Sequence, residues 1–294
     1  MAAPAPAPSP DMQTFKTIGE LRAARSAVGP GTRVGLVPTM GYLHAGHLSL
    51  VEQARNECDL VVVSIFVNPT QFGPAEDLNR YPRDETRDLQ FLESAGVDWV
   101  FLPAAEEIYP PGFQTYVEVR EVTTVLEGAA RPGHFAGVAT VVAKLFNLVQ
   151  PGVAYFGQKD AQQVVVIRRM VRDLNFPVDL VVGMTIREPD GLALSSRNVY
   201  LDPAERQAAL VLSRALRAAH DLWDAGERDG ERLRAAMRAV LAAEPLAQPD
   251  YVSIADPDTL AELDAIVPGQ GALVSLAVRI GRGTRLIDNH ILEP

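Results

Sequence analysis

The chain has 294 residues and 47% hydrophobic content, enough for one large domain or two ordinary ones with substantial cores. Its formal net charge of -10 argues against a nucleic-acid partner, because phosphate-backbone binding needs an extended basic surface, but it permits a small anionic ligand. No apolar run approaches the roughly 20 residues that span a bilayer, so no membrane partner is expected.

The N-terminus and the cysteine content indicate the compartment. The first ten residues, MAAPAPAPSP, lack the basic and apolar regions of a signal peptide and are typical of a flexible tail. The single cysteine, Cys58, cannot form an intrachain disulfide, which is typical of a reducing compartment. It continues the helical stripe of Leu48, Val51 and Ala54, which predicts a buried thiol. We expect a cytoplasmic protein with a disordered tail over 1–12.

Short apolar segments alternate with helical patterns through the first two thirds of the chain. This alternation predicts an α/β fold, a Rossmann-like doubly wound parallel sheet over 13–187 with its site at the carboxyl ends of the strands. The strands are expected at 33–37, 60–67, 98–102, 153–156 and 178–183, and the helices at 48–58, 84–95, 137–149 and 160–174.

The pattern changes after Arg187, where a polar loop precedes a second domain. Asp202, Pro203 and Glu205 form a helix start with a cap, an N1 proline and a reciprocal carboxylate. This part predicts a smaller α+β domain over 188–294 that closes over the site. Its helices are expected along the stripe from Leu212 to Trp223 and over 231–243, and its strands at 251–255, 272–280 and 284–288, the last two joined by the turn Gly281-Arg282-Gly283.

The segment after the first strand carries the most informative motif. An apolar strand runs through a glycine-containing turn into His44-Ala45-Gly46-His47 and then into a helix. A helix start attracts anions, and two imidazoles three residues apart share one helix face, so both rings are expected to point at a bound phosphate. By itself the motif also fits a chance match, surface histidines or a pair of metal ligands.

Polar side chains follow other strands. Gln71 follows the second strand, where it could bind a substrate or cap the loop. Arg131 and His134 lie on a turn before a helix and are equally compatible with a capped turn. These segments are informative only in combination.

Lysine occurs at only three positions, and Lys159 is the one inside a polar motif. Lys159 and Asp160 follow the fourth strand, with Gln163 one turn on from Asp160, although an exposed helix cap would look the same. Ser195, Ser196 and Arg197 suit a triphosphate but are also typical of a serine-rich linker. Because the carboxyl ends of parallel strands share one edge, a single crevice could collect all these groups.

Taken together, the segments VPTMGYLHAGH, SIFVNPTQFG, YPR, RPGHFAGV, YFGQKDAQQ and GLALSSRN resemble the pantothenate synthetase family, the pantoate-β-alanine ligases of the HIGH-motif nucleotidyltransferase superfamily. The resemblance runs from about Phe15 to the C-terminus. It implies that ATP and Mg²⁺ convert pantoate into an enzyme-bound pantoyl adenylate, which β-alanine then attacks to give pantothenate for coenzyme A. It also implies a homodimer.

The resemblance further implies a role for each matching residue. His44 and His47 contact phosphates, with His47 as proton donor, and Lys159, Ser195, Ser196 and Arg197 neutralise charge as pyrophosphate leaves. The ATP site implied in this way consists of Met40, Gly41, Tyr42, Leu43, His44, Ala45, Gly46, His47, Gly157, Gln158, Lys159, Asp160, Ile186, Leu194, Ser195, Ser196 and Arg197. Gln71 and Gln163 bind pantoate, with Gln71 close to β-alanine, Pro38 and Phe156 wall its methyl groups, and Asp88 is the suggested Mg²⁺ contact.

The sequence departs from the family pattern at three places. Leu194 replaces a frequent methionine, Gln158 replaces a frequent glutamate, and Arg87-Asp88 replaces a possible acid pair, which puts the metal contact in doubt. Other readings are an adenylyltransferase, which needs more basic residues for a phosphorylated acceptor, and a tRNA synthetase fragment, which the negative charge disfavours. A nucleotide-binding module without turnover would not need Lys159, and a structural zinc protein would need more ligands.

Overall fold

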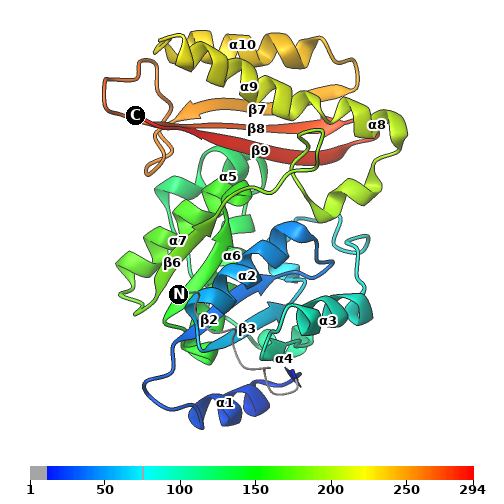
Figure 1. Cartoon of the computed structure of the whole chain (residues 1–294), viewed down its shortest axis with the longest axis vertical. Coiled ribbons are helices and arrows are strands. Elements are labelled where there is room, and N and C mark those ends of the chain that lie inside the picture. The colour runs from blue at the N-terminus through cyan, green and yellow to red at the C-terminus, as the bar shows by residue number, and fades with distance from the viewer. Residues whose placement is uncertain (1–11, 75) are drawn as a thin grey trace, which may run out of the picture. The chain divides into compact units, whose positions relative to one another are not determined.

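The computed structural model describes residues 12–74 and 76–294 (Figure 1). All but Met12 of the tail expected over 1–12 lies outside these residues. The chain divides into two compact units, the first formed by residues up to 118, 133–157 and 167–183, and the second by 119–132, 158–166 and 184–294. The units therefore differ from the expected division at residue 187. The reason is that hydrogen bonds and ion pairs tie 119–132 and 158–166 to elements of the second unit.

The first unit is built on a six-stranded parallel sheet, as the alternation of strands and helices predicts. The order is β1-β4-β3-β2-β5-β6, which confirms a doubly wound arrangement. The edge strand β1 was not expected, because three residues are too few to show a period. The strands are β1 (Gln13–Phe15), β2 (Val34–Thr39), β3 (Leu60–Ile65), β4 (Trp99–Phe101), β5 (Val153–Gly157) and β6 (Asp179–Gly183).

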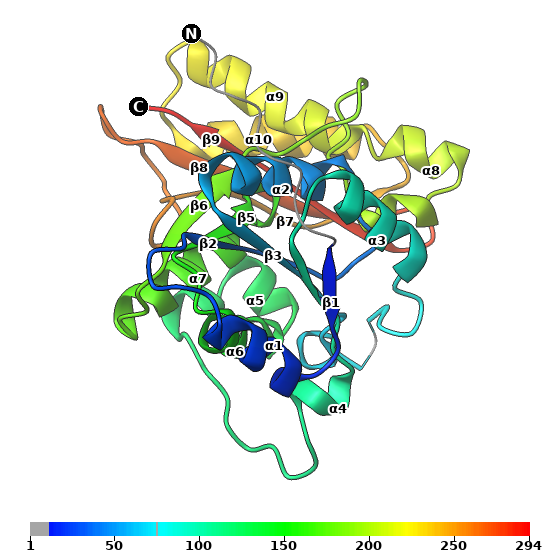
Figure 2. The same ribbon diagram turned by 60° about the horizontal axis from the view of Figure 1, so that its bottom comes forward.

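Helices cover both faces of this sheet. Helices α2 (Ala45–Glu57) and α3 (Glu85–Ser94) lie on one face, and α1 (Ile18–Ser26) and α6 (His134–Val149) lie on the other (Figure 2). Cys58 follows α2 and is buried, as its helical spacing predicts. Helix α7 (Ala161–Asp173) begins in the second unit and continues in the first, and α4 (Ala105–Ile108) is a single turn. No helix within the described residues is long and apolar enough to cross a bilayer.

The strand order places a topological switch point between β2 and β5. Chain connections run outward from β2 through β3 to β4 on one side, and from β5 to β6 on the other. Ligands of doubly wound sheets bind outside the carboxyl ends of the strands at such a point. The His44–His47 segment follows β2 directly, so the sheet topology places this motif at the expected position.

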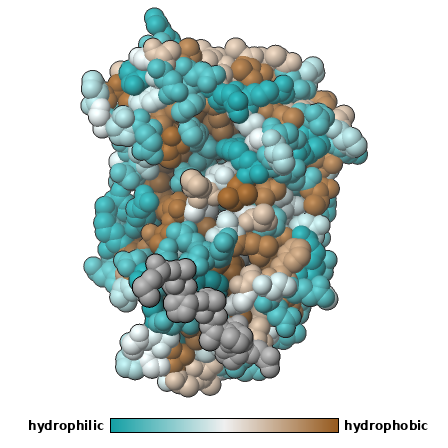
Figure 3. Space-filling model, in the orientation of Figure 1, coloured by the Kyte–Doolittle hydropathy of each residue, from teal (hydrophilic) through white to brown (hydrophobic). Residues whose placement is uncertain are grey.

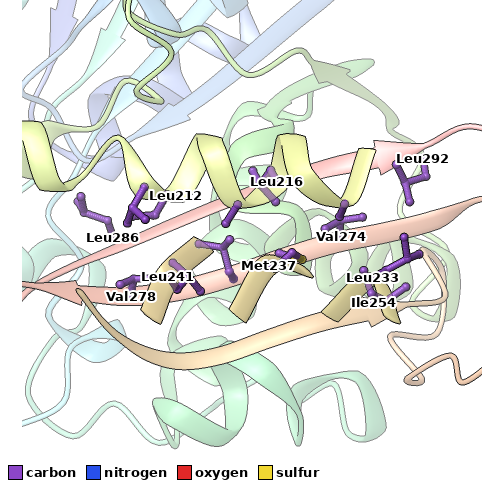
Figure 4. Close-up of a cluster of buried hydrophobic side chains, with 14 of the residues drawn as sticks. Leu212, Leu216, Leu233, Met237, Leu241, Ile254, Val274, Val278, Leu286 and Leu292 are labelled. Carbon is purple, nitrogen blue, oxygen red and sulfur yellow. The ribbon is translucent and has the colours of Figure 1, made fainter. Parts of the chain in front are cut away.

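The second unit is an antiparallel sheet covered by helices. The sheet has the order β7-β8-β9, formed by β7 (Ala247–Ala255), β8 (Ala272–Ile280) and β9 (Thr284–Leu292). Leu212 and Leu216 of α9 (Val211–Asp224), together with Leu233 and Met237 of α10 (Gly230–Ala242), form one buried cluster with Val274 of β8 (Figure 4). Two strands extend beyond the expected bounds, β7 from residue 247 and β9 to residue 292. Short helices α5 (Leu126–Ala130) and α8 (Pro203–Ala208) complete the unit.

Helix α9 shows why the sequence pattern identified this core. Its exposed residues, Arg214, Arg217, Asp221 and Asp224, recur at three- and four-residue spacing opposite the buried stripe. In Figure 3, hydrophilic residues cover much of the outward side of this helix. The second unit therefore has its own apolar core under a polar helical face.

The turn between β8 and β9 is held by the helix start that the sequence predicted. Glu205 accepts the N–H of Asp202 at 3.0 Å in a capping box, and its other oxygen accepts the N–H of Arg282 at 2.9 Å. Arg282 also donates from Nε to Glu205 at 3.2 Å. These hydrogen bonds, the Arg282 side-chain bond first, lower the pKa of Glu205 from 4.5 to about 2.

We predict that Glu205 stabilises the fold in a pH-dependent way. Because its pKa is lower in the folded than in the unfolded chain, its contribution is present above pH 4.5 and is lost as the pH falls toward about 2. Urea unfolding should show that wild type is more stable than Glu205→Gln at pH 7, with a difference that shrinks on acidification over this range. A constant difference between the two proteins would contradict this role.

Candidate active site

The two histidines of the motif cap the start of α2. His44 is the N-cap residue and His47 is three residues on, with ring centroids 4.0 Å apart. The Nδ1 of His44 accepts the N–H of Gly46 at 3.2 Å, and the Nδ1 of His47 accepts the N–H of His44 at 3.3 Å. Since each Nδ1 accepts a backbone proton, each neutral ring carries its own proton on Nε2. The two rings lie side by side, although His44 lies before the helix and not within it.

The loop before His44 has an unusual backbone that Asp88 holds in place. Gly41 and Tyr42 both have positive φ values, 79° and 50°. The Asp88 carboxylate of α3 accepts the N–H of Tyr42 at 2.6 Å and that of Leu43 at 2.8 Å. Arg87 donates to the carbonyl of Leu43 at 2.7 Å, and its guanidinium lies 4.7 Å from the centre of the Tyr42 ring. Adjacent residues of α3 thus fix both polar backbone groups of Leu43.

Asp88, the metal contact suggested by sequence, has a structural part in these contacts. The residue is buried, and each of its carboxylate oxygens accepts a backbone N–H. Burial raises the pKa of Asp88, while the hydrogen bonds from Leu43 and Tyr42 oppose that rise. Within 12–74 and 76–294, no group of three or more His, Cys, Asp or Glu side chains could hold a metal ion. Asp88 is a residue that shapes the loop.

Gln71 is held by a small polar network at the end of β3. It ends the single turn η1 (Pro69–Gln71), and its side chain accepts from Nδ2 of Asn68 at 3.0 Å and contacts Sδ of Met40 at 3.1 Å. Asn68 also accepts from the hydroxyls of Thr70 and Tyr109, both at 2.9 Å. Sequence reasoning missed this role of Asn68. The available signal was an asparagine directly before a proline, which is typical of a helix cap.

Helix α6 packs closely on this turn. A Cβ on Gly137 would lie 2.5 Å from the carbonyl oxygen of Thr70 and 2.7 Å from the nitrogen of Gln71, so only glycine permits the approach. Nδ1 of His134 lies 2.8 Å from the carbonyl oxygen of Gln71. The structure therefore brings His134 to Gln71, whereas Arg131 belongs to the second unit and lies 3.8 Å from Glu127.

The walls expected for pantoate lie near the carboxyl ends of two central strands. Pro38 is the fifth residue of β2, and its lack of an N–H is compatible with this position because the β2–β5 pairing involves only Gly35 and Leu36. Phe156 is buried in β5, directly before Gly157. These residues belong to the first unit, and the chain continues from Gly157 into the second.

In the second unit, the turn η3 (Gln158–Asp160) carries the lysine singled out by sequence. Nζ of Lys159 lies 3.7 Å from the Asp160 carboxylate, and the Lys159 side chain is 20% exposed. Asn289 of β9 contacts the side chain and carbonyl of Gln158 and the carbonyl of Lys159. Gln163 lies in the first turn of α7, three residues beyond Asp160. The turn is therefore attached to the sheet of its own unit.

The loop that bears the Ser-Ser-Arg segment is an ordered hairpin. The N–H of Leu194 donates to the carbonyl of Ile186 at 3.0 Å, and Arg187 and Ala193 form an antiparallel bridge. Ser195 then caps the turn η4 (Ser196–Tyr200) by accepting the N–H of Arg197 at 3.3 Å. Ile186, Leu194 and the Ser-Ser-Arg segment thus form one structural element, which sequence alone could not show.

Comparisons with known proteins cover almost the whole chain. The family model for pantoate-β-alanine ligase matches residues 13–291. A pantothenate synthetase of Chloroflexus aurantiacus is 66% identical over 282 residues, covering 96% of this chain and 99% of the relative. The pantothenate synthetase of Moorella thermoacetica is 57% identical over 286 residues, with 96% and 99% covered.

Two solved structures extend this similarity to the fold. A crystal structure of pantothenate synthetase from Thermus thermophilus is 53% identical with a TM-score of 0.91, covering 96% of this chain and all of that one. The pantoate-β-alanine ligase of Francisella tularensis, complexed with βγ ATP and β-alanine, is 35% identical with a TM-score of 0.78, with 95% and 97% covered.

We predict that Asp88→Ala weakens ATP binding by disordering the loop over 40–43. The buried N–H of Leu43 and the part-buried N–H of Tyr42 lose their acceptor, at a cost of about 1 to 3 kcal/mol. If that cost falls on the ATP-bound state, binding weakens at least roughly fivefold. Calorimetric titration with ATP provides the measurement. Asp84→Ala is the matched control, since Asp84 caps the same helix through the N–H of Arg87 and has no bond to this loop among those described. Equal losses in both variants would contradict the assignment.

Proposed function

Because the chain belongs to the pantoate-β-alanine ligase family, we propose that its site residues carry out ATP-dependent condensation of pantoate with β-alanine in two steps. A carboxylate oxygen of pantoate attacks the α-phosphorus of ATP, and the bond to the bridging oxygen breaks to release pyrophosphate. The amine of β-alanine then attacks the carbonyl of the pantoyl adenylate, loses a proton and expels AMP. Adenylation is needed because a free carboxylate is a poor electrophile and a poor acyl donor.

The observation that most supports this function is the capped start of α2. The rings of His44 and His47 have Nδ1 engaged with the backbone, so Nε2 is the nitrogen that can donate to phosphate oxygens. The helix start adds a partial positive charge. His47 is the proposed proton donor to the leaving pyrophosphate. The remaining residues of 40–47, namely Met40, Gly41, Tyr42, Leu43, Ala45 and Gly46, line the ATP site in this proposal.

The second unit supplies the remaining cationic and hydroxyl groups. We assign to Lys159, Ser195, Ser196 and Arg197 the neutralisation of charge that develops as pyrophosphate departs. A lysine in a partly exposed turn suits this task, because its ammonium is a mobile point charge. In this scheme Gly157 and Asp160 hold the ribose, while Gln158, Ile186 and Leu194 line the nucleotide site. The backbone of Ile186 meets the adenine in this scheme, and its carbonyl also accepts from the N–H of Leu194.

Neutral amides suit the acid substrate. Pantoate carries hydroxyls as well as a carboxylate, and an amide can donate and accept at a lower desolvation cost than a charged group. Gln71 is 8% exposed and oriented by Asn68, so its geometry is set before substrate binds. We propose Gln71 and Gln163 as pantoate ligands, with Pro38 and Phe156 against its methyl groups and Gln71 also close to β-alanine.

The proposal assigns Mg²⁺ no protein ligand. Each Asp88 oxygen already accepts a backbone N–H, and the described residues include no group of three or more His, Cys, Asp or Glu side chains that could hold a metal ion. Mg²⁺ usually keeps several water ligands and binds substrate phosphates, so it would enter with ATP. A homodimer in the cytoplasm completes the proposal.

The activation step can be tested without the second substrate. We expect labelled pyrophosphate to exchange into ATP only when pantoate is present, and without β-alanine, because the first step is reversible and complete in itself. Omitting pantoate is the control. Exchange that ignores pantoate would rule out pantoate as the activated acid.

Lys159→Ala should slow this exchange by about 100-fold or more, because removing one group that stabilises transition-state charge typically costs 10²–10³ in rate. Circular dichroism should show an unchanged fold. Lys16→Ala is the matched control, since that side chain is 68% exposed and 3.7 Å from Glu85 on the surface. A normal rate in Lys159→Ala would contradict the role given to this lysine.

A further inference from the structure

Two consecutive polar residues lie buried in the middle of the edge strand β9. Asp288 is 2% exposed and Asn289 is 4% exposed. Side chains alternate between the two faces of a strand, and Leu286 and Leu292 face the helix-covered core. Asp288 therefore points to the helical face and Asn289 to the opposite one. Strand β9 thus presents one polar group on each face, at adjacent positions.

Asn289 holds the turn that carries Lys159. Its Nδ2 donates to two consecutive carbonyls, those of Gln158 at 3.0 Å and Lys159 at 2.8 Å, which uses both of its hydrogens. Its Oδ1 accepts from the side-chain amide of Gln158 at 3.0 Å. One side chain therefore fixes the backbone on which the Lys159 and Asp160 side chains stand.

Asp288 holds the hairpin that carries the Ser-Ser-Arg segment. Its carboxylate forms a two-point ion pair with Arg187, with Nη1 at 2.6 Å and Nη2 at 2.8 Å, and also accepts the N–H of Asn289 at 2.8 Å. Arg187 in turn donates to the carbonyl of Gly191 at 3.1 Å, across the hairpin. The bridge between Arg187 and Ala193 lies two residues before Ser195. The ion pair thus anchors the base from which this segment projects.

We propose that Asp288 and Asn289 are positioning residues for the activation step, each setting the location of one group of phosphate-binding side chains. This inference rests on the roles proposed above for Lys159 and for the Ser-Ser-Arg segment. Because the two residues are neighbours on one rigid strand, the distance between the two groups is set within the second unit itself. Proximity catalysis depends on such fixed geometry.

The test uses substitutions that keep the side-chain shape. Asn289→Asp replaces the donating nitrogen by an oxygen that faces two carbonyls, and Asp288→Asn removes the charge opposite Arg187. Pantoate-dependent pyrophosphate exchange should slow by about 10- to 100-fold in each, the effect typical of losing a group that orients an active-site side chain. Asp288→Asn should not alter the hydrogen-exchange protection of 158–160, which Asn289 holds.

A double-mutant cycle tests whether Asn289 acts through Lys159. If it does, adding Asn289→Asp to Lys159→Ala should cost much less than it costs in the wild-type background. Effects that simply multiply would overturn the positioning role. Glu262→Gln is the matched control, because Glu262 accepts from Arg234 at 2.9 Å in the same unit and both residues lie outside the proposed site. This control should lower stability but leave exchange kinetics unchanged.

Amide hydrogen exchange separates this inference from the proposed function. Asn289→Asp should speed deuterium uptake by peptides covering 158–166, and Asp288→Asn should speed uptake by peptides covering 186–195. Uptake by the other peptides should stay unchanged in both variants. If deuterium uptake by these two sets of peptides did not change, the inference would be overturned, whichever acid the enzyme activates. A different outcome would overturn only the proposed substrate. In that outcome the variants take up deuterium faster, but the wild-type enzyme exchanges pyrophosphate into ATP without pantoate.

Discussion

Backbone N–H groups at the start of α2 must find acceptors, and that requirement organises the first unit's part of the site. Asp88 takes those of Tyr42 and Leu43, and the two histidines take those of Gly46 and His44. Both histidines use Nδ1 for these contacts, and the proposed function assigns phosphate binding to Nε2. The same hydrogen bonds that stabilise the helix start therefore determine its chemistry.

In the second unit, side chains of β9 hold one loop through its carbonyls and another through an ion pair. The turn at Gln158–Asp160 and the hairpin before Ser195 have little regular secondary structure, so side chains from β9 supply their partners. Elsewhere in this unit Gln162 and Arg285 tie Glu127 of α5 to α7 and β9 in a similar way. Under the proposed function, these contacts would hold the phosphate-binding side chains of both loops on one strand.

Local sequence patterns predicted the elements whose structure depends mainly on residues close together in the chain. Buried parallel strands such as β3 are continuous apolar runs, and the start of α8 shows its cap, proline and reciprocal carboxylate within four residues. The strand β1 and the segment 119–132 gave no such signal. Strand β1 is placed by its pairing with β4, and the segment 119–132 by the ion pair of Glu127 with Arg285 of β9. Both contacts involve residues far away in the chain.

The sequence by itself determined the parallel α/β sheet, the helical layer of the second unit, the family, and the identity of the histidines, lysine and glutamines proposed for the site. The sheet and the helical layer follow from local periodicity, whereas the family and the proposed site residues follow from the resemblance of the motifs to a known family. Only the tertiary structure decided that Asp88 holds the loop before His44 and that Asp288 and Asn289 hold two loops of the second unit. A hydrogen bond between residues 46 or 130 positions apart leaves no trace in local sequence, because its geometry exists only after the chain has folded.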